Sequence, residues 1–259
     1  MGEGQKAPLL LCGRGLGPVA ERREGEGIGP AKLMTPLERF VFSFFNADVA
    51  ARYWPDILQG FLLTTYLGLA VIAAGIPLGL LLASIRSFRR LPLNALIVIF
   101  ADVFRALPPL MVIIILFFAF PYVDISMNAF VATWIALTLV LAAFAEEIFW
   151  AGILSVPHGQ LEAARALGLR RIHGLVFIVL PQAVRLAIPP LTNRMIAITK
   201  GTALGSVVAL HEILNEASSA ASNSGNATPM MMGAAAYLVL FVPFVLFGRW
   251  VETRFAWKR

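Results

Sequence analysis

Four ionisable residues lie inside stretches of the sequence that are otherwise apolar. Asp102 and Arg105 are three residues apart in one apolar run, and Glu146 and Glu147 are adjacent in the next. Charge is costly in lipid, so such residues generally face a helix-bundle interior or a water-filled path. Such residues could line the path of a polar solute, but the stronger interpretation is that all four are paired or snorkelling groups near the interface.

The sequence lacks the usual motifs of catalysis. It contains neither a GxxxxGK[ST] phosphate loop nor a GxSxG elbow. His158, His173 and His211 have neither each other nor a cysteine at metal-ligand spacing. We therefore predict no catalytic residue, no metal site and no cofactor bound by this chain.

One long basic segment, residues 155–181, separates two of the apolar runs. Residues 160–167 are predicted to form a short helix, and Gly168 then supplies the permissive backbone that commonly ends a helix. We expect a second helical piece over 169–180, which ends before Pro181. The segment is thus predicted to form two short helices joined at a glycine.

The first of these helices has very little side-chain bulk. Glu162, in the predicted first turn where a carboxylate suits the helix dipole, and Arg165 flank a small patch as an i,i+3 pair. The patch would let a partner protein approach the backbone closely, and it consists of Ala163, Ala164 and Ala166. On pattern alone, an ordinary solvated loop helix explains these alanines equally well.

The spacing of this segment resembles the EAA signature of the permease subunits of ABC importers. It reads Glu162-Ala163-Ala164, three residues, Gly168, nine residues, Ile178, one residue, Leu180-Pro181. In that family the loop is a coupling helix that docks into a groove on a cytoplasmic ATPase. The resemblance implies that ATPase docking involves six residues, namely Glu162, Ala163, Ala164, Arg165, Gly168 and Leu169.

Other stretches resemble the polar amino-acid permeases of this family, the histidine/glutamine/arginine group. Residues 104–110 are similar to F-R-G-T-P-L-L, 147–160 to E-I-F-R-G-G-I…P-K-G-Q, and 200–208 to K-D/N-T-S-L-V-S-V-I. The resemblance covers about residues 57–255. It implies a substrate pathway that includes Phe104, Arg105, Glu147, Thr202 and Glu212.

Several positions depart from that pattern. Ala106 and Leu107 replace glycine and threonine, and Trp150 stands where arginine is usual. Gly201 replaces an acidic or amide residue and Ala203 replaces serine, which removes polar groups near the pathway. A cavity without a carboxylate is a poorer site for a cationic amino acid. We therefore expect a neutral, acidic or amino-acid-like solute, unless a partner permease supplies the missing groups.

Composition indicates an integral membrane protein. Of the 259 residues, 59% are hydrophobic and 14% are charged, against ~45–50% and ~25% in soluble domains. A formal net charge of +6 would suit nucleic-acid binding in a soluble chain. Here the basic residues flank apolar runs, so membrane topology explains them better. We expect membrane lipid, and no nucleic acid, as a partner.

The predicted fold is an all-α integral membrane fold of the type I ABC-importer kind, with about five transmembrane helices and a cytoplasmic coupling helix. Residues 1–35 are interpreted as a disordered tail. Residues 36–56 are interpreted as an aromatic-rich interfacial amphipathic segment or a plain linker. The permease domain then covers 57–259. Its spans, each near or above the ~20 residues that cross a bilayer, are predicted at 57–85, 93–120, 128–150, 183–198 and 230–251.

Lys and Arg in the short loops predict the orientation. They follow the first span, surround residues 155–181 and close the chain, whereas the loop 120–128 contains only Asp124. The coupling loop and the C-terminus are therefore expected in the cytoplasm. The resemblance implies a multi-pass protein of the bacterial inner membrane.

The resemblance also implies function and partners. It predicts the permease subunit of an ABC importer, which moves an amino acid or similar solute by alternating access. Its expected partners are a cytoplasmic ATPase dimer that binds ATP and Mg, a second permease subunit in a homo- or heterodimer, and an external solute-binding protein. Two alternatives remain: a non-transporting scaffold that binds an ATPase, and a secondary carrier, which would need paired broken helices in an internal repeat.

Overall fold

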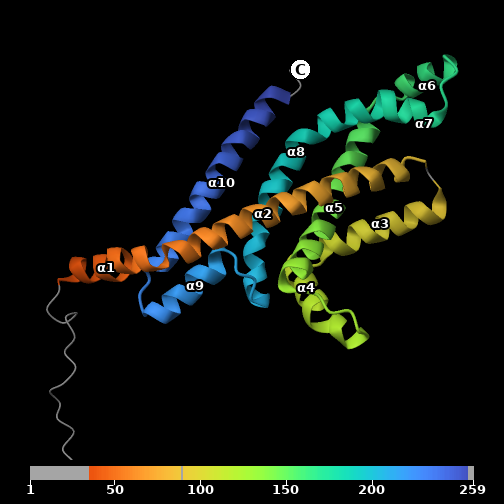
Figure 1. Ribbon diagram of the computed structural model, residues 1–259. Coiled ribbons are helices and arrows are strands. Elements are labelled where there is room, and N and C mark those ends of the chain that lie inside the picture. The colour runs from red at the N-terminus through yellow and green to blue at the C-terminus, as the bar shows by residue number, and fades with distance from the viewer. Residues whose placement is uncertain (1–34, 89, 256–259) are drawn as a thin grey trace, which may run out of the picture. The chain divides into compact units, whose positions relative to one another are not determined.

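The computed structural model describes residues 35–88 and 90–255, and within them the chain forms helices and loops with no strand (Figure 1). Except for Thr35, the predicted tail at 1–35 lies outside these residues. The chain divides into two compact units after Arg39, and the packing described below lies within the second. Among the described residues, four helices are long and apolar enough to cross a membrane, or five if one bent pair is a single span. The predicted all-helical membrane fold is confirmed.

The predicted interfacial segment at 36–56 is divided in the structure. α1 (Pro36–Phe44) is followed by the long helix α2 (Ala47–Arg86). Asn46 starts α2, because its side-chain oxygen accepts hydrogen bonds from two backbone N–H groups of the first turn. Residues 47–56 therefore continue directly into the first apolar span, and only α1 forms a segment of its own.

The second apolar run is broken at two consecutive prolines. α3 (Leu91–Ala106) ends before them, and α4 (Pro109–Ile114) continues through a π-helical and a 3₁₀ turn to Val123. A residue before proline is disfavoured in helical conformation, and Leu107 and Pro108 are accordingly extended, each with a ψ of 132°. The axes of Leu91–Ala106 and Pro109–Val123 are bent by 104° relative to each other. The span predicted at 93–120 is thus sharply bent, which is typical of a broken span or a re-entrant loop.

α5 (Ala129–Ser155) is the helix against which α2, α3 and α8 (Leu180–Lys200) pack. It runs along α2 and contacts α3 and α8 (Figure 1). Gly79 of α2 permits this approach, because a Cβ added there would lie 2.5 Å from the Cβ of Ala145. The absence of a side chain at Gly79 thus allows α2 and α5 to pack closely at this contact.

The basic segment at 155–181 forms α6 (His158–Ala166), α7 (Arg171–Gly174) and a π-helical turn (Leu175–Val179). The prediction that a helical piece ends before Pro181 is wrong. α8 takes Pro181 into its first turn, where proline is tolerated because N–H groups there lack an intrahelical partner. The apolar helix consequently extends over Arg171–Val208, well beyond the predicted span at 183–198.

The C-terminal part packs back on α2 and α8. A 3₁₀ helix (Gly201–Val208) follows α8, then come α9 (Ile213–Ser224) and α10 (Thr228–Phe255). α10 contacts α2, α8 and α9, so the last span closes one side of the bundle.

Candidate functional site

α6 ends in a hydrogen-bonded cap built on Gly168. The backbone N–H of Gly168 donates to the carbonyl of Arg165 at 2.9 Å, and the N–H of Leu169 donates to the carbonyl of Ala164 at 3.1 Å. This pair of bonds is the Schellman motif, which requires a left-handed residue. Gly168 has a φ of +81°, and a Cβ added to it would meet no atom within 4 Å. Glycine is needed here for its backbone angle, not for space.

The exposed face of α6 differs from the predicted one at a single alanine. Ala164 is only 1% exposed, because its Cβ points toward Gly174 of the following helix. The prediction that Ala164 belongs to the presented patch is therefore wrong. The other five predicted docking residues are exposed, namely Glu162, Ala163, Arg165, Gly168 and Leu169.

The predicted environment of Glu162 also changes. Because α6 begins at His158, Glu162 lies in the second turn and not the first. Within the described ranges, no ion pair joins Glu162 to Arg165. Both side chains are thus left exposed at the surface of α6.

A cleft of about 460 Å³ lies between α3, α5 and α8. Glu147 stands roughly 12 Å before the end of α5, and Arg194 roughly 21 Å after the start of α8, at 1.5 Å per residue. The cleft therefore lies along the length of α5 and α8, and Arg105 reaches it from the last turn of α3. Its lining is Arg105, Phe144, Glu147, Ile148, Pro190, Asn193, Arg194 and Ala197.

All four ionisable residues singled out in the sequence belong to one network beside this cleft. Arg105 lies 3.3 Å from a carboxylate oxygen of Glu147 and 3.8 Å from one of Asp102. Arg86, at the end of α2, donates to both oxygens of the fully buried Glu146 at 3.0 and 3.2 Å, and lies 3.7 Å from Glu147. The network joins α2, α3 and α5, and Glu147 is shared between two arginines.

Arg194 was missed in the sequence, although a charged residue inside the predicted span at 183–198 was a signal for it. Its guanidinium carbon lies 3.9 Å from the ring centroid of Phe144, a cation–π contact. No carboxylate of the described part of the chain comes within ion-pair distance of it. The cleft therefore contains one arginine with an aromatic neighbour and no counter-ion.

The remaining predicted pathway residues do not line the cleft. Phe104 packs against the apolar core, and Thr202 is buried with its hydroxyl donating to the carbonyl of Thr199 at 2.8 Å. Glu212 is buried and caps α9. The structure thus brings together Arg105 and Glu147 and sets Phe104, Thr202 and Glu212 apart from them.

Both oxygens of the Glu212 carboxylate accept hydrogen bonds. It accepts from the N–H groups of Leu214 and Asn215 at 2.9 and 2.7 Å, and from the hydroxyl of Tyr237 at 2.6 Å. Burial raises the pKa of Glu212 above its ordinary value, against the opposite effect of these hydrogen bonds. Glu212 thus ties α9 to α10.

These features define a multi-pass helical membrane protein with a charged cleft inside its spans. A family model described as "binding-protein-dependent transport system inner membrane component" matches residues 75–257. The chain belongs to this family, and it is a permease subunit of an ABC transporter. Proteins of this family work with an ATPase and a substrate-binding protein and are not themselves enzymes.

Similar proteins of known name agree with this assignment. A probable glutamine permease of Bacillus subtilis, GlnP, is 36% identical over 61% of this chain and 73% of its own. The L-cystine permease TcyB of the same organism is 31% identical over 76% of this chain and 85% of its own.

Solved structures show the same fold. A crystal structure of an amino acid ABC transporter with histidines is 27% identical, covers 79% of this chain and 96% of its own, and has a TM-score of 0.71. The MetNI methionine transporter, at 19% identity and a TM-score of 0.58, shows likeness of fold alone.

Proposed function

We propose that this permease carries a neutral or acidic α-amino acid through the cleft between α3, α5 and α8. The observation that carries the proposal is Arg194, which has no counter-ion among the described residues. An unpaired charge within an apolar span is costly, and a solute carboxylate would supply its partner. Glu147, which lines the same cleft, offers a carboxylate to the ammonium group of the solute.

The charge of the cleft bears on the choice of amino acid. Arg105 and Arg194 line the cleft with a single carboxylate, that of Glu147. Arg105 already pairs with Glu147 and Asp102, so the positive charge of Arg194 is the one left without a partner. A cationic side chain would be repelled there. This agrees with the solute expected from the missing polar groups at Gly201 and Ala203. The relatives named for glutamine and cystine support the same choice.

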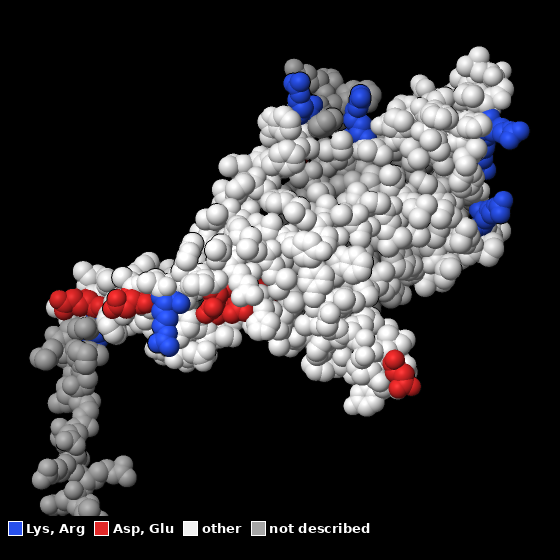
Figure 2. All heavy atoms as spheres, in the orientation of Figure 1, with Lys and Arg blue, Asp and Glu red and all other residues white. Residues whose placement is uncertain are grey.

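We also propose how the chain is oriented and what it meets on each side. Basic side chains gather at the end of the molecule that carries α6 and α7 and near the end of α10. Acidic ones lie at the tip beyond α4 and, together with a basic one, near α9 and the start of α2 (Figure 2). This asymmetry supports a cytoplasmic position for α6 and the C-terminus in a bacterial inner membrane. There α6 would dock on an ATPase dimer that binds ATP and Mg, with a second permease subunit alongside and a solute-binding protein outside.

The two alternative functions are less well supported. A non-transporting scaffold would have no use for an unpaired arginine kept within the membrane, where charge is costly. A secondary carrier of the repeat type would need paired broken helices, and the described residues contain one bent pair.

The test is ATP hydrolysis by the permease reconstituted with its ATPase and binding protein. We expect a neutral or acidic amino acid, such as glutamine or glutamate, to stimulate turnover, and arginine or lysine to have no effect. Stimulation by cationic amino acids alone would overturn the assignment of the cleft. An ATPase that binds but responds to no amino acid would favour the scaffold.

A further inference from the structure

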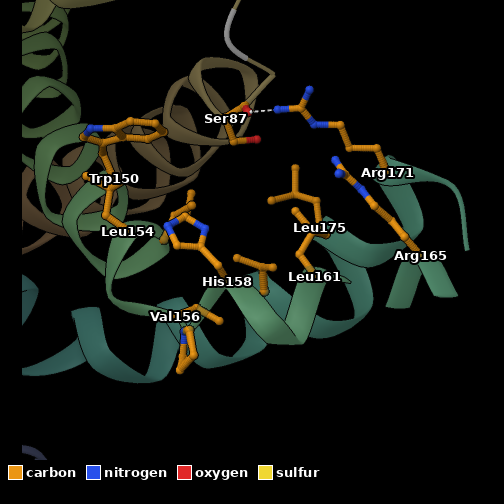
Figure 3. A pocket seen from close by; sticks show the side chains of 12 residues that line it. Ser87, Trp150, Leu154, Val156, His158, Leu161, Arg165, Arg171 and Leu175 are labelled. Carbon is orange, nitrogen blue, oxygen red and sulfur yellow. Dashed lines mark hydrogen bonds between the residues drawn. The ribbon is translucent and has the colours of Figure 1, made fainter. Parts of the chain in front are cut away.

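A second cavity, of about 360 Å³, lies between the coupling helix α6 and the ends of α2 and α5. It is separate from the solute cleft and shares no lining residue with it. Arg165 and Arg171 stand on one side of this pocket and Trp150 on the other (Figure 3). The pocket therefore has a cationic side and an aromatic side.

The cationic side is not neutralised from within. His158 joins the two arginines in the lining, and none of the lining residues is acidic. Arg171 is held in place because its guanidinium donates to the carbonyl of Ser87 at 2.7 Å and lies 5.7 Å from the ring of Phe88. Neither a hydrogen bond nor an ion pair among the described residues engages the side chain of Arg165. An anion in this pocket would meet two cationic side chains and no lining carboxylate.

Most of the other lining residues are apolar, and exposed apolar side chains lie near them in the sequence. Leu154, which lines it, is 51% exposed, and Val176 and Phe177, next to the lining residue Leu175, are 44% and 70% exposed. A small soluble anion would leave these side chains uncovered. A phospholipid would cover them with its acyl chains while its phosphate met the arginines.

We propose that this pocket binds the headgroup of an anionic phospholipid, with the acyl chains along Leu154 and Phe177. Basic pockets between membrane helices are typical sites for such headgroups. Trp150 lines the pocket at a position where the polar amino-acid permeases that this chain resembles usually have arginine. Its aromatic ring is of the kind that lies at headgroup depth. The bound lipid would touch Arg165 of the coupling helix directly. Anionic-lipid content would thereby act on the element that meets the ATPase.

The pocket can be tested by fluorescence quenching of Trp150. The full chain is prepared with its other four tryptophans changed to phenylalanine and is reconstituted in vesicles. One set contains phosphatidylglycerol with brominated acyl chains in ordinary phosphatidylcholine, and the other contains brominated phosphatidylcholine in ordinary phosphatidylglycerol. We expect brominated phosphatidylglycerol to quench Trp150 at a lower mole fraction than brominated phosphatidylcholine does.

Charge variants then separate the pocket from general surface attraction. Arg165→Gln and Arg171→Gln should each weaken the preference for phosphatidylglycerol about fivefold, equivalent to ~1 kcal/mol per basic side chain. Arg171→Gln also removes the hydrogen bond to the carbonyl of Ser87 and can disturb the fold locally. Arg165→Gln removes no such bond, so its effect reports the charge of the pocket alone. Arg170→Gln, in the same exposed loop but outside the lining, is the matched control and should leave the preference unchanged.

Three outcomes would overturn the proposal. Equal quenching by the two brominated lipids would show no selectivity for the anionic headgroup. A loss of preference in Arg170→Gln as large as in Arg165→Gln would show attraction by the whole basic surface. Displacement of phosphatidylglycerol by inorganic phosphate at millimolar concentration would assign the pocket to a soluble anion.

Discussion

Substitution of Gly168 should uncouple transport from ATP hydrolysis while leaving the spans intact. The cap that ends α6 requires a φ of +81° at this position, and space is not limiting because a Cβ would meet no atom within 4 Å. A residue with a Cβ in the left-handed region costs roughly 1–2 kcal/mol. Gly168→Ala should therefore lower the population of the capped end of α6 about fivefold or more.

Gly168→Pro should have a larger effect. Proline fixes φ near −65° and has no N–H, so the variant loses both the backbone angle and the 2.9 Å bond to the carbonyl of Arg165. The cap cannot form, and the exposed residues of α6 lose their fixed orientation toward the proposed ATPase groove. We expect solute-stimulated hydrolysis to be lost in Gly168→Pro and reduced in Gly168→Ala.

The assay measures solute uptake and ATP hydrolysis together in vesicles that contain the ATPase and the loaded binding protein. Gly159→Ala is the matched control: Gly159 lies in the same helix, has no left-handed φ, and is also free of contacts within 4 Å of an added Cβ. Alanine should strengthen α6 there by ~1 kcal/mol. Wild-type uptake per ATP in Gly168→Pro, with the protein inserted and the ATPase bound, would refute the reasoning.

Three further perturbations test the cleft and the packing. Arg194→Gln should raise the solute concentration that gives half-maximal stimulation of ATP hydrolysis about tenfold or more, since a hydrogen bond to a charged group contributes roughly 1.5–3 kcal/mol. The control is Arg185→Gln, which changes an exposed residue on the same helix but outside the cleft. It should leave this concentration unchanged. Gly79→Val should lower the free energy of unfolding in detergent by roughly 1–3 kcal/mol, because the added Cβ would lie 2.5 Å from the Cβ of Ala145. An unchanged melting temperature would contradict the α2–α5 packing. Glu212 has a raised pKa, so the folded state holds more protons between the ordinary and the raised value, and stability falls as pH rises through that window. In Glu212→Gln the melting temperature should no longer fall with pH in melting curves recorded over this pH window.

Much of the fold could be predicted because the signals for it are local. The break at Pro108 and Pro109 follows from what proline does to its own neighbourhood, and the glycine end of α6 follows from one residue's backbone freedom. Two of the errors in the helix bounds also come from proline. Pro181 lies in the first turn of a helix, and Pro55 lies inside one. Whether a proline begins, interrupts or ends a helix depends on the turn in which tertiary packing places it.

The candidate site was predictable only in part, because charge in an apolar run identifies a residue but not its partner. Glu146 and Glu147 were found in this way, yet their contacts with Arg86 depend on how α2 and α5 are rotated against each other. The resemblance to the polar amino-acid permeases likewise assigned residues to the substrate pathway without showing where their side chains point. It included Glu212, whose side chain turns to α9 and α10 and away from the cleft.

The shared position of Glu147 suggests how solute binding and helix packing are linked. Its carboxylate lies 3.3 Å from Arg105 and 3.7 Å from Arg86, so an ammonium group that approaches it must compete with both arginines. Arg86 keeps both hydrogen bonds from its Nη1 to Glu146 in either case. Arg105 would keep the longer contact with Asp102 and a weaker contact with α5, 5.8 Å from the ring of Phe144. Solute binding would thus loosen α3 from α5 while leaving α2 attached. A solute can shift helices only through such a difference in contacts between two states, and α3 is the element on which the charges concentrate that difference.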